Sequence, residues 1–171
     1  LHFPAGSGSY LQTPSSAIIN IDYGPGVIEG WIMVPAFPGS TMRFYDMNVG
    51  FPIGLIVTST GKLRCEIGAG AFADTGTGQL VAGQWHHFMV RAVNSADWRL
   101  AIDGVYTVNS GSPSVNTGAT DFAIGGSPWT GGGANDGMEF YMHDFRITKG
   151  VLLYAAASTS FAPPNAPFPT S

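Results

Sequence analysis

The residues between Glu139 and Asp144 come closest to a catalytic arrangement in this sequence. Retaining hydrolysis of a glycosidic bond needs two carboxyl groups about 5–5.5 Å apart. On a β-strand, alternation would place Glu139, Tyr141 and His143 on one face and Asp144 on the other. The pattern therefore supplies no carboxylate pair on one face, and we predict that the protein is not an enzyme.

The histidines and the single cysteine form no metal-binding pattern. His86 and His87 follow Trp85 at a predicted strand start, and their rings point to opposite faces, so they cannot chelate one ion. Cys65 alternates with charged neighbours, which indicates a small buried residue on a strand. One cysteine also excludes an internal disulfide and a multi-cysteine metal site. We predict no metal site and no cofactor.

A site for a sugar ring needs an exposed aromatic side chain, with amides or carboxylates that bind the hydroxyl groups. Trp129 lies in the glycine-rich stretch 125–137 together with Asn135 and Asp136, and this loop is the best local match. In the alternative interpretation, Trp129 folds inward and covers an edge of the protein. The other three tryptophans lie on predicted strands and are expected in the core.

The composition excludes several classes of partner. Only 11% of the residues are charged, the net charge is −4, and the seven Lys and Arg residues are scattered singly. Without a basic stripe, we predict no nucleic-acid partner and no binding to an anionic membrane surface. No apolar run reaches the 18 or so residues of a membrane-spanning helix. The 44% hydrophobic content argues against disorder and for one domain with a core.

Strand patterns recur at short intervals along the chain, and helical patterns hardly occur. Strands are predicted at 10–13, 26–34, 42–49, 53–58, 62–67, 87–93, 98–102, 105–108, 122–124 and 138–147. The predicted core residues are Trp31, Trp85, Phe88, Trp98, Leu100, Ile102, Ile124 and Phe140. Asp103-Gly104 predicts a tight hairpin turn, and residues 150–157 are expected to form a short helical turn. Short strands without βαβ alternation predict an all-β sandwich or barrel.

Several of these segments resemble parts of concanavalin A-like, laminin-G-type domains. Leu1–Phe3 with Gly8–Leu11 resembles their opening strand pair, Gly30–Ile32 their central strand, and Gly83–Phe88 with Trp98–Gly104 their best-marked hairpin. The resemblance implies a two-sheet antiparallel jelly-roll sandwich over residues 1–160, followed by a proline-rich extended tail over 161–171.

Calcium is the one ion that this resemblance suggests as a ligand, because several relatives bind it. Its ligands would be oxygens of Asn135, Asp136 or Asp74, although the sequence holds no Asp-rich cluster.

The C-terminal part, from Arg146–Val151 through Tyr154 to Phe161–Pro169, resembles the ending of laminin-G-type domains in bacteriophage virion proteins. The resemblance implies a non-enzymatic structural protein at the virion surface or outside a cell, as a decoration (cement) subunit or a tail or fibre part. The alternative is a glycan-binding module for host adhesion, in which the Trp129 loop binds a surface sugar. A glycoside hydrolase would require carboxylates distant in sequence to converge.

Proline makes the tail stiff and extended and removes backbone donors, which favours docking on a surface. The predicted partner contacts are Phe161, Pro163, Pro164 and Phe168. We expect Phe161 to pack on its own domain and Phe168 to contact a neighbour, either a second copy of the chain or another virion subunit.

Overall fold

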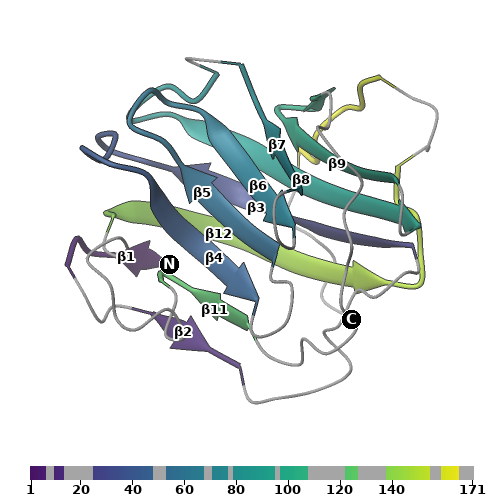
Figure 1. Ribbon diagram of the computed structural model, residues 1–171, viewed down its shortest axis with the longest axis horizontal. Coiled ribbons are helices and arrows are strands. Elements are labelled where there is room, and N and C mark those ends of the chain that lie inside the picture. The colour runs from purple at the N-terminus through teal and green to yellow at the C-terminus, as the bar shows by residue number, and fades with distance from the viewer. Residues whose placement is uncertain are drawn as a thin grey trace.

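The computed structural model describes residues 1–6, 10–13, 25–47, 53–67, 71–76, 79–94, 97–107, 122–126, 138–154 and 159–165. Within these ranges twelve strands form two six-stranded antiparallel sheets that lie face to face, without any helix (Figure 1). This arrangement is the predicted jelly-roll sandwich. Across these residues no helix could span a membrane.

Sheet A runs, in spatial order, through β1 (His2–Phe3), β12 (Phe140–Lys149), β3 (Gly26–Met33), β8 (Trp85–Asn94), β9 (Asp97–Ile102) and β10 (Val105–Tyr106). Sheet B runs through β2 (Leu11–Gln12), β11 (Phe122–Ile124), β4 (Met42–Met47), β5 (Ile53–Val57), β6 (Leu63–Ile67) and β7 (Ala71–Asp74). The strand patterns predict all of these except β1 and β7. The family resemblance implied β1, and the alanines of β7 have low β-propensity.

The core lies between the sheets, where alternate residues of each strand point inward. The ring of Phe44 packs edge-on against Phe88 at 5.3 Å and against Phe140 at 5.9 Å between centroids. Cys65 is buried here as predicted, and desolvation raises the pKa of its thiol.

Six of the eight predicted core residues are buried, which confirms Phe88, Trp98, Leu100, Ile102, Ile124 and Phe140. The prediction is wrong for the other two. Trp31 is half-buried and Trp85 is 42% exposed, because both lie on the outer face of sheet A. Ile32 lies one position after Trp31 and Phe88 lies three positions after Trp85, and both point into the core. Because side chains alternate along a strand, both tryptophans point outward.

The hairpin between β9 and β10 has the predicted turn. Asp103 and Gly104 both have positive φ, 48° and 79°, as a primed two-residue turn requires. The carboxylate of Asp103 lies 2.7 Å from His86 Nδ1 and accepts a hydrogen bond from the His87 backbone N–H at 2.9 Å. His86 Nε2 accepts from the Val81 N–H, so His86 has the structural role predicted for it.

The C-terminal segment, residues 150–154 and 159–165, crosses the outer face of sheet A, and we call it the strap. Residues 150–154 form no helical turn, contrary to the prediction, because Gly150 turns the chain at positive φ and its N–H bonds the Pro25 carbonyl. Farther along, Ser160 pairs with Val105 at the free edge of β10. In Figure 1 the yellow strap leaves the end of β12 and runs beside β9.

Candidate functional site

The residues predicted to bind a sugar, Trp129, Asn135 and Asp136, lie outside the described residues, as does Phe168. Their roles therefore stay predictions. Phe161, Pro163 and Pro164 lie in the strap, where Phe161 is half-buried against its own sheet, 5.8 Å from the His87 ring and 4.1 Å from the Tyr154 ring between centroids.

The outer face of sheet A has two halves, which differ in what covers them. In the covered half the strap residues Tyr154 and Phe161, with Tyr106, pack over the fully buried Val27, Met89 and Ala101. The open half lies toward β1 and comprises His2, Met33, Tyr141, His143, Trp31 and Trp85. These side chains are half-buried or exposed, so this part of the face is accessible to a ligand.

Strand register brings the open half together from four strands that are distant in sequence. One row joins His2, Tyr141, Met33 and Trp85 across β1, β12, β3 and β8. The next row begins with His143, which is paired with Trp31.

Aromatic contacts make the open half a continuous surface. The His143 ring stacks on Trp31 with centroids 5.9 Å apart and planes 6° apart, and Trp85 meets it edge-on at 4.6 Å. Nearer the edge, His2 stacks on Tyr141 at 4.4 Å. Because Trp85 keeps 42% of its surface exposed, its ring can stack on the apolar face of a sugar.

Two carboxylates flank this aromatic surface, each beside an imidazole. Asp144 Oδ2 lies 3.1 Å from His143 Nδ1, and Glu139 Oε1 lies 3.1 Å from His2 Nε2. The His143 and Glu139 side chains are 47% and 43% exposed, so both pairs can bind hydroxyl groups of a ligand.

A β-bulge places Asp144 beside His143. Two residues of β12, Asp144 and Phe145, lie opposite the single Gly30 of β3, and Asp144 has a φ of 50°. Strict alternation predicted that Asp144 would face away from His143, and this prediction is wrong because the bulge interrupts the alternation. A Cβ at position 30 would lie 3.2 Å from the Phe88 ring and 3.3 Å from Phe145 Cα, which explains the glycine.

Glu29 is buried at the boundary with the covered half and anchors the strap. Its carboxylate accepts hydrogen bonds from Arg146 at 2.5 and 3.1 Å and from the Tyr154 hydroxyl at 2.6 Å. His87 Nε2 lies 3.3 Å away, but outside hydrogen-bond geometry. Desolvation favours the protonated acid, yet the contacts with His87, Tyr154 and Arg146 outweigh it and lower the pKa of Glu29.

The outward position of Trp31 and Trp85 could have been predicted from charged residues on the same face of their strands. Glu29 lies two positions before Trp31, and Arg91 lies six positions after Trp85, so each pair shares one strand face. The segment 26–34 is apolar on both of its faces, which concealed this pattern. Val27 points outward but can be apolar because the strap covers that part of the outer face.

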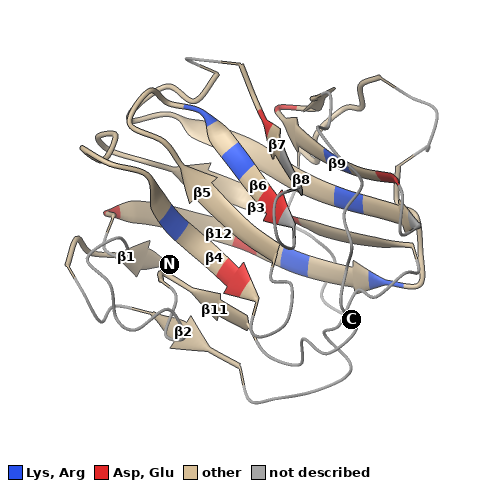
Figure 2. Ribbon diagram, viewed as in Figure 1, with Lys and Arg blue, Asp and Glu red and all other residues tan. Residues whose placement is uncertain are grey.

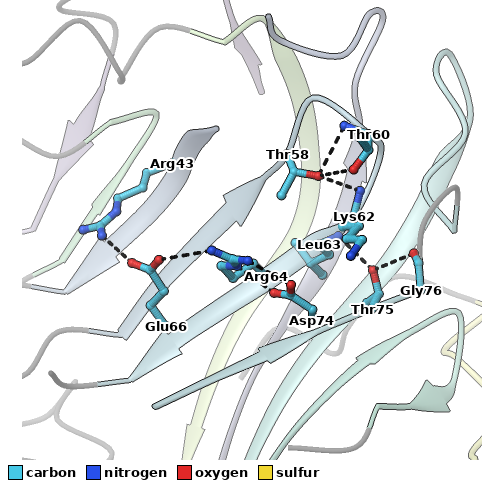
Figure 3. Close-up of polar contacts among 10 residues, drawn as sticks. All are labelled: Arg43, Thr58, Thr60, Lys62, Leu63, Arg64, Glu66, Asp74, Thr75 and Gly76. Atoms are coloured by element: carbon cyan, nitrogen blue, oxygen red, sulfur yellow. Dashed lines mark hydrogen bonds and ion pairs between the residues drawn. The ribbon is translucent and has the colours of Figure 1, made fainter. Parts of the chain in front are cut away.

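The outer face of sheet B carries charges that neutralise one another (Figure 3). Arg43 reaches Glu66 at 2.6 Å, and Arg64 donates to both carboxylate oxygens of Asp74 at 2.7 and 2.9 Å. Asp74 therefore does not fit the calcium-ligand role, since Arg64 occupies its oxygens. No group of three metal-ligating side chains occurs in the described ranges, and Asn135 and Asp136 lie outside them.

The comparisons with known proteins agree with this fold. Residues 5–156 match the laminin-G family model of the concanavalin A-like lectin/glucanases superfamily, whereas no curated protein matches the sequence. Trypanosoma rangeli sialidase, in complex with 2,3-difluorosialic acid, superposes with a TM-score of 0.65 and 16% identity over 84% of this chain. The chain spans only 24% of the sialidase.

Two further solved structures are also similar. Domain 4 of AbnA, an extracellular arabinanase from Geobacillus stearothermophilus, in complex with arabinotriose, has a TM-score of 0.60 and 20% identity, covering 85% of this chain and 69% of that one. Domains LG4-5 of the mouse laminin alpha1 chain have a TM-score of 0.60 and 14% identity, covering 85% and 41%. The two stacked sheets and the match over residues 5–156 show that this chain belongs to the concanavalin A-like lectin/glucanase superfamily, as a laminin-G-type domain.

Proposed function

We propose that the protein is a non-enzymatic glycan-binding module whose ligand lies on the open half of sheet A. The observation that carries this proposal is the exposed Trp85 beside the stacked His143 and Trp31. A sugar ring would stack on Trp85, while Asp144 and Glu139 accept hydrogen bonds from its hydroxyl groups. The arabinotriose complex of AbnA domain 4 supports this use of the fold.

The spacing of the carboxylates supports binding without hydrolysis. Asp144 lies five positions after Glu139, a backbone spacing of up to about 16 Å at the usual rise per residue. Glycosidases hold their carboxyl groups about 5–5.5 Å or 6.5–9.5 Å apart. Glu29 is fully buried under Arg146 and Tyr154, so it does not complete a pair.

The test is a glycan-array screen followed by calorimetric titration of the best oligosaccharide. Trp85→Ala should weaken binding by roughly tenfold or more, since losing one stacking contact is worth on the order of 1.4 kcal/mol. Leu153→Ala removes an apolar side chain of similar exposure, 38%, in the strap and should leave binding unchanged. Equal binding by Trp85→Ala and the parent protein would contradict the site, and release of reducing ends would contradict the absence of catalysis.

The second candidate is a structural subunit on the virion surface. It is favoured by the similarity of Arg146–Pro169 to bacteriophage virion proteins, with a second copy of the chain or other virion subunits as partners. The two candidates are compatible, because a fibre or decoration subunit can also bind a host glycan. Imaging of an intact particle with antibody against this chain should label the surface, and particles without label would exclude the role.

A further inference from the structure

Every lysine and arginine of this sequence can be placed, because all seven lie in the described ranges. They are Arg43, Lys62 and Arg64 in sheet B and its β5–β6 hairpin, Arg91 on β8, Arg99 on β9, and Arg146 and Lys149 on the C-terminal half of β12. Figure 2 shows no blue segment at the β1 end of sheet A. The open half therefore holds no lysine or arginine, and no other part of the chain can supply one.

The cations nearest along the strands are engaged elsewhere. Arg146 lies three positions beyond His143, but its guanidinium binds Glu29 beside the strap. Arg91 is fully buried, donates to the Tyr106 hydroxyl at 3.2 Å and lies over the Tyr106 ring.

The carboxylate side chains that border the open half are negative. Glu139 and Asp144 stand at its edge, each beside one histidine. The carboxylate or sulfate of an acidic sugar would lose water there without a guanidinium partner, and two carboxylates would repel it. Proteins that recognise such groups use arginine, whose fork matches two oxygens at once.

Resting on the proposed function, we infer that the ligand is an uncharged glycan, built of neutral hexoses, pentoses or N-acetylated sugars. Glycans that carry sialic acid, uronic acid or sulfate are rejected at this face. The fold is shared with a sialidase whose complex contains a sialic acid derivative, but this face lacks the arginines that such a carboxylate needs.

Matched probe pairs test this inference at about pH 8, where an ordinary imidazole is neutral. We would titrate N-acetyllactosamine against its sialylated form, and galactotriose against the corresponding galacturonic trisaccharide, alongside arabinotriose. At least one neutral probe should bind, and its charged counterpart should bind at least tenfold more weakly. Charged probes binding equally or better would overturn the inference while keeping the glycan site. Failure of every glycan, including those on an array, would overturn the proposed function itself.

Two variants that each add one arginine distinguish an effect of charge on the open half from an effect of the net charge of −4. Met33→Arg adds a guanidinium in the row between Tyr141 and Trp85 and should reduce the preference for neutral probes several-fold. Val151→Arg adds the same charge at an exposed position of the strap, 53% exposed, and should leave the preference unchanged. An equal effect of both variants would show that net charge, and not the open half, sets the preference. Unchanged melting temperatures serve as the folding control.

Discussion

Glu29 is the residue at which the sheet and the strap depend on each other. The fully buried carboxylate is ionised, with a pKa below its usual value, and it accepts from Arg146 on β12 and Tyr154 in the strap. A group with a lowered folded pKa stabilises the protein above its unfolded pKa and loses that contribution as the pH falls through the folded pKa. Part of the stability at neutral pH therefore rests on this anion.

Glu29→Gln should lower the free energy of unfolding by about 1–3 kcal/mol at pH 7, since the hydrogen bonds lose their charge. The difference between variant and parent should shrink as the pH falls below the pKa of an unfolded glutamate and through the lowered pKa of the folded Glu29 carboxylate. Urea denaturation from pH 7 to pH 3 measures both curves. Parallel curves at all pH values would show that Glu29 is not an ionised anchor.

At the scale of elements, the strap and the β9–β10 hairpin require the same glycine. Gly104 has a φ of 79°, and a Cβ built on it would clash with the Phe161 carbonyl oxygen. Gly83 has a φ of 75°, but nothing lies within 4 Å of its Cβ position. Alanine substitutions at Gly83 and Gly104 therefore distinguish the cost of backbone strain alone from the added cost of a clash with the strap.

Gly83→Ala should cost about 1–2 kcal/mol, the usual penalty of a side chain in the left-handed region. Gly104→Ala should cost at least twice as much, because Phe161 must also move and uncover Met89 and Ala101. Thermal unfolding of both variants gives the comparison. Equal losses of stability would mean that the strap is loosely held at the hairpin.

Truncation after Pro164 tests the remaining role of the tail. The shortened chain keeps Tyr154 and Phe161 on the sheet, so its melting temperature should equal that of the parent. If Phe168 contacts a neighbour as predicted, self-association measured by sedimentation should fall. Unchanged association would remove Phe168 from the partner contacts.

Sequence patterns predict the strands and the inward residues well, because period two and turn residues are local properties. Ile102 and Phe140 follow this rule. Trp31 and Trp85 did not, because their outward position depends on which face the strap covers, a contact between segments distant in sequence. Asp144 was also misplaced, since the bulge arises where β12 pairs with Gly30, on a strand distant in sequence.

At the scale of the whole molecule, strand neighbours are distant in sequence. β1 pairs with β12, and β3 lies between β12 and β8, so sheet A cannot form before most of the chain is present. Proteins dominated by such pairings fold in milliseconds to seconds. Stopped-flow tryptophan fluorescence should show refolding in that range, and complete refolding within microseconds would contradict the importance of these pairings.

The bulge in β12 has a consequence for how such a module can change. Without Asp144, the residues Tyr141, His143 and Arg146 would alternate regularly with the inward Phe140, Met142 and Phe145. Asp144 is thus an insertion that leaves every neighbour on its own side of the sheet and adds one carboxylate beside His143. Deletion of Asp144 would therefore restore regular alternation and remove the carboxylate beside His143, while every neighbouring side chain keeps its own face of the sheet.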